Sequence, residues 1–266
     1  MSEVLISCEG LVKEFPVKRA VFTGRVKEVF RAVDTVNLEV HAGETLGLVG
    51  ESGSGKSTTG EILGDLQRPS AGTVKYRGKD IRSLSGAEYE RYRRNVQFIF
   101  QDPKGSMNPN ARIEAILTEP LITLKLESDP LRRKTLACEM CDAVGLERSV
   151  LRKFPAELSG GQCQRIAIAR ALITKPELIV CDEAVSALDV SVQAQILNLL
   201  KEVQRSFGLS YLFISHDIGV VNFMADRVAV MYRGKIVESG SADEVLLHPT
   251  QDYTKRLLEA SFARRD

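Results

Sequence analysis

The chain has 266 residues, of which 44% are apolar and 27% are charged. This balance is that of an ordinary globular protein, and the length predicts one core domain with an additional subdomain. The 36 Lys and Arg residues are offset by 35 Asp and Glu residues, which leaves a net charge of +1. No net field therefore draws the chain toward nucleic acid, and we expect no nucleic-acid partner.

We expect neither secretion, membrane insertion nor disulfide formation. The first residues contain no basic segment followed by an apolar run, as a secretory leader would. No apolar stretch approaches the roughly 20 residues that a membrane-spanning helix needs. The five cysteines favour a reduced cytosolic chain. Cys138 and Cys141 form a lone C-x-x-C inside a predicted helix, and we interpret them as packing residues.

The first part of the chain is predicted to form strands. Val36, Leu38 and Val40 alternate with polar residues, which is typical of a half-buried strand. The short apolar run at 45–49 predicts a strand covered on both faces. Residues 17–30 carry four basic residues against one glutamate, and we predict a solvated basic loop there.

A helical subdomain is predicted over about residues 102–175. It follows a predicted strand at 96–100. We expect four prolines to divide its first part into short helical pieces: Pro103, Pro109, Pro120 and Pro130. One helix has clear end signals, with Asp129 as N-cap, Pro130 in the first turn and Gly145 just beyond the end.

Strands and helices then alternate to the end of the chain. We expect helices over 159–174, 190–207 and 253–261, strands over 178–181 and 211–214, and a hairpin over 227–238 around Arg233-Gly234. This alternation indicates a mostly parallel α/β sheet, whose ligand binds beyond the carboxyl ends of the strands.

Residues 50–57, Gly-Glu-Ser-Gly-Ser-Gly-Lys-Ser, match G-x-x-x-x-G-K-[ST] between a predicted strand and a predicted helix. The glycines allow backbone N–H groups to close around phosphate oxygens, and the helix N-terminus adds positive potential. Lys56 would place a charge on the β- and γ-phosphates, and the Ser57 hydroxyl is a hard oxygen ligand for Mg²⁺. The alternative is a glycine-rich turn with an incidental lysine. The predicted nucleotide-binding residues of this segment are Gly50, Ser52, Gly53, Ser54, Gly55, Lys56, Ser57 and Thr58.

Two carboxylates, Asp182 and Glu183, end the apolar run at 178–181. Carboxylates at the end of a buried strand are costly unless a ligand uses them. Asp182 would hold Mg²⁺, and Glu183 would act as the general base for an attacking water. The alternative is a strand end that breaks into an acidic turn.

Residues 158–162, Leu-Ser-Gly-Gly-Gln, open a second predicted helix with a hydroxyl and paired glycines. A helix N-terminus of this kind can bind an anion. Because the loop at 50–57 already suffices for one nucleotide, this second device suggests action on the nucleotide of another molecule. The alternative is a helix cap, since Ser159 is a good N-cap residue.

In this order the motifs resemble the nucleotide-binding subunit of ABC transporters, whose signature is the run at 158–162. The resemblance covers nearly the whole chain. It implies an α/β fold: a P-loop NTPase core with a mostly parallel sheet, an N-terminal antiparallel β subdomain and an inserted α-helical subdomain. It also implies one nucleotide-binding domain over 1–266, with a helical subdomain at about 102–175 and a short C-terminal extension at about 241–266.

The resemblance implies roles for further residues. Gln101 would sense Mg²⁺ and the attacking water, Asp189 would contact the opposite subunit, and His216 would bind the γ-phosphate and Glu183. Read alone, His216 would be a structural histidine. Phe15 resembles the aromatic residue that stacks on adenine, with an ordinary apolar strand residue as the alternative. The resulting prediction is catalytic Glu183, His216 and Gln101; metal-binding Ser57, Gln101 and Asp182; and, beside the loop residues, nucleotide-binding Phe15, Ser159, Gly160, Gly161, Gln162 and Asp189.

Three segments resemble more narrowly the oligopeptide and dipeptide importer branch, which includes nickel importers and a phosphonate-degradation accessory ATPase. They are residues 15–19 with the insertion that follows, 189–195 and 248–255. The branch implies import of di- or oligopeptides. A nickel or other small-solute importer and a soluble non-transport ATPase stay open as alternatives. Ala184 stands where many members have proline, and because alanine contributes no side-chain chemistry we expect hydrolysis to survive this departure. Peptide-importing members often carry a C-terminal cysteine cluster, and none appears after Cys181, which leaves the substrate open.

The resemblance implies that two subunits close head to tail around two ATP molecules with Mg²⁺. The second ATPase subunit would be an identical chain or a sibling, and permease subunits and a solute-binding protein would complete the importer. The chain would then be peripheral, at the cytoplasmic face of the inner membrane. Three rival classes fit less well. A P-loop kinase has no use for residues 158–162, a DNA-repair or translation ATPase would carry two cassettes or a coiled coil, and an exporter would usually be fused to membrane spans.

Overall fold

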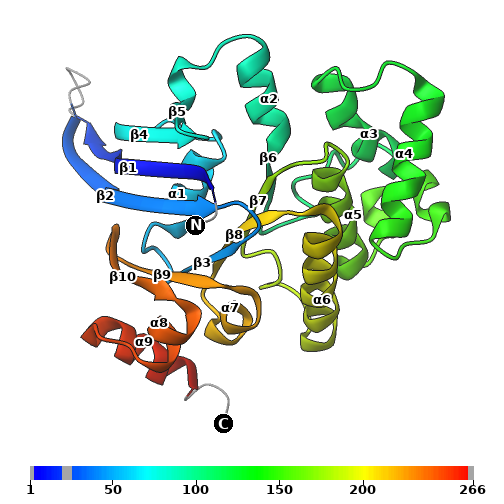
Figure 1. Ribbon diagram of the computed structural model, residues 1–266. Coiled ribbons are helices and arrows are strands. Elements are labelled where there is room, and N and C mark those ends of the chain that lie inside the picture. Colours follow the sequence, from blue (N-terminus) through cyan, green and yellow to red (C-terminus); the bar gives the residue numbers. More distant parts are fainter. Residues whose placement is uncertain (1–2, 20–25, 263–266) are drawn as a thin grey trace. The chain divides into compact units, whose positions relative to one another are not determined.

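The computed structural model describes residues 3–19 and 26–262 (Figure 1). The chain forms two compact units. The first unit combines the chain up to Leu84 with the chain from Leu212 onward, and the second unit is Ser85–Tyr211. Within the described ranges, no helix combines the length and apolar character needed to cross a membrane.

The first unit contains a four-stranded antiparallel sheet in the order β2-β1-β4-β5. Its strands are β1 (Val4–Arg19), β2 (Val26–His41), β4 (Ala71–Tyr76) and β5 (Lys79–Asp80). The alternation predicted from residue 36 onward is confirmed, because the apolar residues of this part of β2 are buried and the polar residues between them are exposed.

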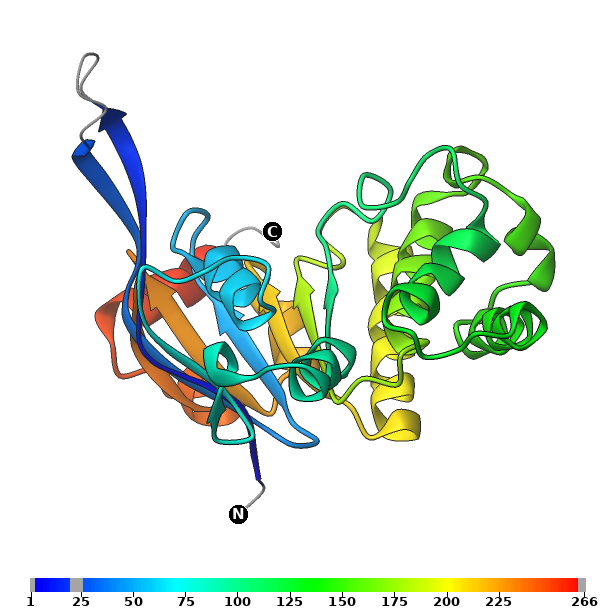
Figure 2. The same cartoon turned by 90° about the horizontal axis from the view of Figure 1, so that it is seen from above.

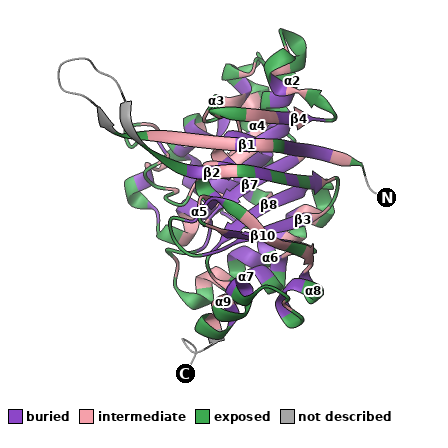
Figure 3. Ribbon diagram, turned by 90° about the vertical axis from the view of Figure 1, so that its left-hand side faces the viewer, coloured by how far each residue is buried: buried purple, intermediate pink, exposed green. Residues whose placement is uncertain are grey.

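The basic loop predicted over residues 17–30 is wrong in part. β1 continues to Arg19 and β2 begins at Val26, and these two residues are paired (Figure 2). Strand pairing satisfies backbone N–H and C=O groups that a loop would leave to water. Burial decreases along this hairpin, from the buried residues 5–8 to the exposed residues 16–17 (Figure 3). Residues 20–25 of the predicted loop lie outside the described residues.

The first unit also contains strands in the order β10-β9-β3-β8. They are β3 (Thr45–Val49), β8 (Ser210–Ser215, which begins at the end of the second unit), β9 (Arg227–Tyr232) and β10 (Lys235–Ser241). β3 runs parallel to β9 and is buried along its whole length, as predicted. β9 and β10 form the predicted hairpin, whose two turn residues have φ values of 46° and 84°.

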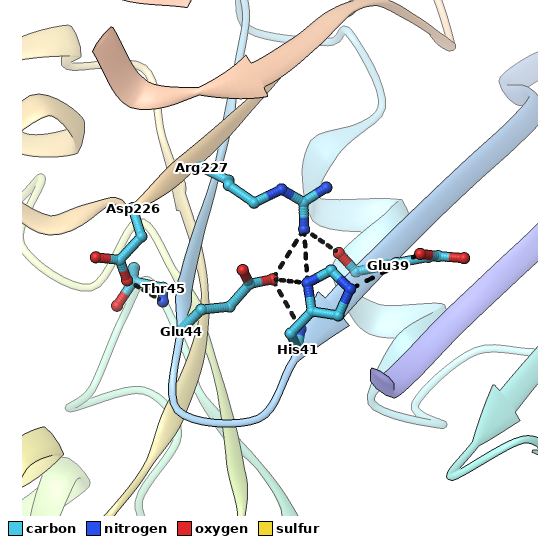
Figure 4. A network of polar contacts seen from close by, with 6 residues as sticks. All are labelled: Glu39, His41, Glu44, Thr45, Asp226 and Arg227. Atoms are coloured by element: carbon cyan, nitrogen blue, oxygen red, sulfur yellow. Dashed lines mark hydrogen bonds and ion pairs between the residues drawn. The ribbon is translucent and has the colours of Figure 1, made fainter. Parts of the chain in front are cut away.

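A polar network anchors the start of β3 to the start of β9 (Figure 4). The Thr45 N–H donates to the Asp226 carboxylate at 2.7 Å, and the Asp226 N–H donates to the Thr45 carbonyl at 2.9 Å. The Glu44 carboxylate accepts hydrogen bonds from the Arg227 guanidinium at 3.0 Å and from the His41 N–H at 2.7 Å. These contacts hold the register of the strand that leads into residues 50–57.

The helices of the first unit lie in both of its chain segments. They are α1 (Lys56–Leu63), the 3-10 turn Ile81–Ser83, α7 (Ile218–Met224), α8 (Ala242–Leu247) and α9 (Asp252–Phe262). α7 packs closely on β3, because a Cβ at Gly47 would lie 2.6 Å from the Val221 Cγ1 atom. α9 confirms the predicted last helix to within one residue at each end.

The second unit contains two parallel strands and five α-helices among its described elements. The strands are β6 (Val96–Ile99) and β7 (Leu178–Asp182), and the helices are α2 (Ala87–Asn95), α3 (Ile113–Thr123), α4 (Pro130–Ala143), α5 (Gly160–Leu172) and α6 (Val190–Phe207), with 3-10 turns at Arg148–Arg152 and Pro155–Glu157. The predicted ends of α4 and α6 are confirmed, since Gly145 and Gly208 both have a φ of 66°.

The prediction that Pro120 breaks the helical segment is wrong, because Pro120 lies inside α3. A proline within a helix costs about 3 kcal/mol. Burial of one large apolar side chain contributes roughly 1.5–3 kcal/mol. α3 buries four such side chains, which together outweigh the proline: Ile113, Ile116, Leu117 and Leu121.

Cys138 and Cys141 lie within α4, as predicted. The pKa of the Cys141 thiol is raised to about 11, mainly by burial and to a smaller extent by the nearby Cys138 and Asp142. A thiol with this pKa is protonated at neutral pH and is a poor nucleophile. This environment supports the interpretation of Cys141 as a packing residue.

Candidate functional site

The predicted site residues form two groups, one in each unit. The phosphate loop (residues 50–57) lies between β3 and α1 in the first unit. The acidic strand end (residues 182–183) and the signature turn (residues 158–162) lie in the second unit. Different local structures position these residues: a strand–loop–helix turn for the phosphate loop, a strand end for residues 182–183 and a helix N-terminus for residues 158–162.

Two glycines of the phosphate loop are required by close backbone contacts. A Cβ at Gly50 would lie 2.1 Å from the Met231 carbonyl oxygen, and a Cβ at Gly55 would lie 2.2 Å from the Ala32 carbonyl oxygen. Gly53 is required for another reason, since its φ is +78° but a Cβ there would meet no described atom within 4 Å. The loop is therefore shaped both by its own dihedral angles and by β2 and β9.

Lys56 provides a buried positive charge at the centre of the loop. Its side chain is 4% exposed, and its Nζ donates to the carbonyls of Gly50 and Glu51, both at 2.8 Å. α1 begins at this residue, so the N–H groups of its first turn open toward the loop. A cation and a helix N-terminus at one place favour binding of an anion such as phosphate.

The turn between β9 and β10 braces the phosphate loop. The Gly234 N–H donates to the Ser54 carbonyl at 2.9 Å, and the Gly234 carbonyl accepts from the Asp34 N–H at 2.8 Å. The Arg31 guanidinium hydrogen-bonds the Asp34 carboxylate at 3.0 Å and is the main cause of a lowered pKa for that group. The loop is thus tied through one turn to β2.

Phe15 and His216 also lie in the first unit. Phe15, in β1, is half-buried and pairs across the sheet with Phe30 of β2, and the Lys13 Nζ lies 5.2 Å from the centroid of its ring. His216 is exposed in the short link between β8 and α7. Asp217, the next residue, caps α7 by accepting the Gly219 N–H at 2.8 Å, which holds the backbone at this link.

In the second unit, Gln101 and Glu183 meet at the ends of two parallel strands. The Gln101 Nε2 donates to the Glu183 Oε2 at 2.8 Å. The strand register explains this contact, because Ile99 of β6 pairs with Cys181 of β7 and each site residue lies two positions further on. The hydrogen bond orients the carboxylate and adds partial positive charge beside it.

Glu183 has a φ of 47°, which is rare for a residue with a side chain. Its carbonyl accepts hydrogen bonds from the Ser186 N–H at 3.1 Å and the Ser186 hydroxyl at 3.0 Å. Asp182, at the end of β7, is only 8% exposed. Backbone strain of this kind is concentrated at functional sites, where surrounding contacts maintain it. The buried Ala184 that follows adds no polar group.

The signature turn forms a capping box at the start of α5. The Ser159 Oγ accepts the Gln162 N–H at 3.3 Å, and the Gln162 side chain accepts the Ser159 N–H at 3.0 Å. Ser159 and Gly160 are nevertheless exposed. A Cβ at Gly161 would lie 2.7 Å from the Val192 Cγ1 atom, so α5 begins close to the first turn of α6, where the exposed Asp189 is the N-cap.

Sequence reasoning missed one contact with the phosphate loop. The Tyr253 hydroxyl, in α9, accepts the Glu51 N–H at 3.2 Å. In the sequence, Tyr253 opens the predicted last helix and belongs to the segment 248–255, which resembles one branch of a family. No local pattern could place it at the loop, because 202 residues separate the two partners.

Comparisons with known proteins agree with these features. Residues 33–186 match the family model described as ABC transporter. The chain is 46% identical over 260 residues to the oligopeptide transport ATP-binding protein OppF of Lactococcus lactis subsp. lactis (strain IL1403), covering 98% of this chain and 81% of that protein. It is 46% identical over 261 residues to the protein of the same name from Salmonella typhimurium, covering 97% of this chain and 78% of that protein.

Solved structures give the same result. The dimeric structure of MJ0796, a bacterial ABC transporter cassette, has a TM-score of 0.78 and 30% identity, over 90% of this chain and 99% of that chain. A second structure of that cassette, in a dimeric post-hydrolysis state bound to ADP and Pi, has a TM-score of 0.77 at 30% identity, with the same coverage.

Proposed function

This chain belongs to the ABC transporter family, and we propose that it is the ATP-hydrolysing subunit of an importer for di- or oligopeptides. The observation that carries the hydrolytic part is the Glu183 carboxylate, which is held by Gln101 in a strained turn at the end of β7. The peptide substrate is supported by the names of the two oligopeptide transport relatives.

The phosphate loop is proposed to bind the triphosphate of ATP. Lys56 would transfer its hydrogen bonds from the loop carbonyls to the β- and γ-phosphates, while the amides between Gly53 and Ser57 surround the phosphate oxygens. Phe15 would stack on adenine, helped by its half-exposed ring. The ADP and Pi in the related cassette support nucleotide as the ligand.

In the proposed reaction, Glu183 accepts a proton from the water that attacks the γ-phosphate. Gln101 keeps the carboxylate oriented for this transfer, and a positioned general base contributes roughly 10²–10⁴-fold in rate. His216 would hydrogen-bond the γ-phosphate, a contact that exists with ATP but not with ADP. The bond between the β- and γ-phosphates breaks, and ADP and inorganic phosphate leave.

The residues present fit Mg²⁺. The proposed ligands are the Ser57 hydroxyl, the Asp182 carboxylate and the Gln101 amide oxygen, all hard oxygen donors of the kind that this ion prefers. Asp182 is 8% exposed, and a carboxylate this buried is stabilised by a cation. When bound, the ion would neutralise charge on the phosphate oxygens.

Hydrolysis is proposed to require a second ATPase subunit, an identical chain or a sibling. The exposed Ser159 and Gly160, with Gly161 and Gln162, would contact the nucleotide on the partner, and Asp189 would contact the partner's surface. The chain would act as one nucleotide-binding domain over residues 1–266, with a helical subdomain at about 102–175 and a short C-terminal extension at about 241–266.

The complete importer would include permease subunits and, indirectly, a solute-binding protein. The chain would be peripheral, at the cytoplasmic face of the inner membrane. The segment that follows Gln101 would transmit closure of the ATPase dimer to the permease. These partners are inferred from family membership.

The proposed hydrolytic role of Glu183 can be tested with the purified chain. Glu183→Gln should lower ATP hydrolysis at least about 100-fold and cause an ATP-bound dimer to accumulate, as seen by size-exclusion chromatography. Glu139→Gln, which removes an exposed carboxylate of α4, is the control and should change neither. Unchanged turnover in Glu183→Gln would refute the assignment.

For the substrate, cells with the chromosomal Glu183→Gln allele should lose uptake of radiolabelled dipeptides or oligopeptides. Loss of nickel uptake instead would replace peptides by that ion as the cargo. Normal uptake of both, with hydrolysis lost, would identify a non-transport ATPase.

A further inference from the structure

We propose that Tyr253, in the C-terminal helix α9, is a positioning residue for ATP binding. Its hydroxyl holds the second residue of the phosphate loop in place by accepting the Glu51 N–H at 3.2 Å. This inference rests on the proposed function, because it assigns a role toward the nucleotide that the phosphate loop would bind. It gives the C-terminal extension a direct role in the ATPase site.

The hydrogen bond occupies a donor that the loop itself does not use. The Glu51 carbonyl is already engaged by Lys56 at 2.8 Å and by the Ser54 N–H at 3.2 Å. With the Tyr253 hydroxyl on its N–H, both backbone polar groups of Glu51 are satisfied. The second residue of the loop is therefore held on both sides by backbone hydrogen bonds.

Tyr253 is itself rigidly placed. Tyr253 is 8% exposed, and the centroid of its ring lies 4.0 Å from the centroid of the Tyr232 ring, with an interplanar angle of 32°. The Arg233 guanidinium lies 5.1 Å from the centroid of the Tyr232 ring, on which it packs. Tyr232 is the last residue of β9, and Arg233 belongs to the turn that follows. The next residue of this turn, Gly234, donates its N–H to the Ser54 carbonyl of the phosphate loop at 2.9 Å. The packed residues Tyr253, Tyr232 and the turn at 233–234 thus contact the loop at two residues, Glu51 and Ser54.

A carboxylate anchors the start of α9 to β10. The Glu238 side chain accepts the Thr250 N–H at 2.7 Å, the Thr250 hydroxyl at 2.8 Å and the Gln251 N–H at 3.2 Å. Burial raises the pKa of Glu238, but hydrogen bonds from residues 250–254 outweigh this effect and leave the pKa below its ordinary value. The segment that carries Tyr253 is therefore fixed before the helix begins.

The consequence is a specific effect on nucleotide affinity. A single neutral hydrogen bond changes an equilibrium by about 2- to 12-fold. Removing the Tyr253 hydroxyl leaves the ring and its stacking partner in place but frees the Glu51 amide. The loop then samples other conformations, and ATP binding must restore the competent one.

The decisive variant is Tyr253→Phe in the full chain. We expect the KM for ATP and the dissociation constant of ADP to rise about 3- to 10-fold, while kcat at saturating ATP stays within twofold of wild type. The matched control is Tyr232→Phe, because no hydrogen bond among the described residues joins the Tyr232 hydroxyl to the loop. This control should leave all three constants unchanged.

The outcomes separate this inference from the proposed function. If wild type binds ADP and Tyr253→Phe binds it equally well, the positioning role is wrong and the proposed function is unaffected. If Tyr253→Phe lowers only the melting temperature, as a purely structural residue would, the positioning role is also wrong. If wild type binds neither ATP nor ADP, the proposed function itself fails.

Discussion

The side-chain amide of Gln101 lies 2.8 Å from the carboxylate of Glu183, although 82 residues separate them in the chain. The pairing of β6 with β7 produces this contact, because the two residues extend equally far beyond two strands in parallel register. The positive φ of Glu183 turns the chain immediately after the strand. A carboxylate and the amide that orients it thus meet beyond the ends of two paired strands.

This contact predicts that Gln101 acts on hydrolysis through Glu183. Gln101→Ala should lower kcat about 10-fold or more, because a hydrogen bond to a charged group contributes roughly 1.5–3 kcal/mol. In a Glu183→Gln background, and at saturating Mg²⁺ so that loss of the proposed Gln101 ligand does not limit the rate, the same substitution should add less than about twofold, since the effect that Gln101 exerts through Glu183 is already lost. Steady-state ATPase assays on the four proteins of this cycle measure both effects.

The control for this cycle is Gln97→Ala, which removes an amide from β6, the strand that precedes Gln101. Among the described residues, the Gln97 Nε2 donates only to backbone carbonyls, at 2.7 Å to Arg93 and 3.4 Å to Arg94. Its kcat should equal that of wild type. If Gln101→Ala and Glu183→Gln instead lower kcat independently, the positioning role of Gln101 is excluded.

Ser159 offers a test that separates a helix cap from a nucleotide contact. Ser159→Ala should abolish hydrolysis while the isolated subunit still binds ADP, because the hydroxyl is proposed to act on the partner's nucleotide. The lost cap should also lower the free energy of unfolding by about 0.5–2 kcal/mol. ATPase assays, ADP titration by calorimetry and urea unfolding measure the three properties.

The chain contains a matched control for this prediction at α8. Ser241 forms the same capping box, accepting the Glu244 N–H at 3.3 Å and donating its own N–H to the Glu244 side chain at 2.9 Å. Ser241→Ala should destabilise the protein by a similar amount and leave hydrolysis intact. Loss of ADP binding in Ser159→Ala would place Ser159 in the chain's own nucleotide site.

Two glycines of the phosphate loop should respond differently to the same methyl group. In Gly55→Ala the new Cβ would meet the Ala32 carbonyl oxygen at 2.2 Å, so the loop must move and ADP affinity should fall at least about 10-fold. In Gly53→Ala the penalty is the left-handed φ alone, about 1–2 kcal/mol. Urea unfolding should therefore rank Gly55→Ala below Gly53→Ala. Equal stability of the two variants would contradict the close contact.

Elements with local signals could be predicted from the sequence. α6 ends where Gly208 adopts a positive φ, and the capping box at Ser159 starts α5, because both effects involve only neighbouring residues. Two predictions were wrong, at Pro120 and along part of residues 17–30. In both places the secondary structure depends on contacts with residues that are distant in the sequence. Burial of one face of α3 overrode the proline, and strand pairing overrode the loop-like composition.

The sequence by itself determined which chemical groups this protein carries and in which order: the glycines and lysine of the phosphate loop, the paired carboxylates and the signature turn. Only the tertiary structure decided which of them meet. It brought Gln101 to Glu183 and the Tyr253 hydroxyl to the Glu51 amide. Such contacts depend on strand register and on the packing of side chains across the fold, and these are set by many distant residues together rather than by any local pattern.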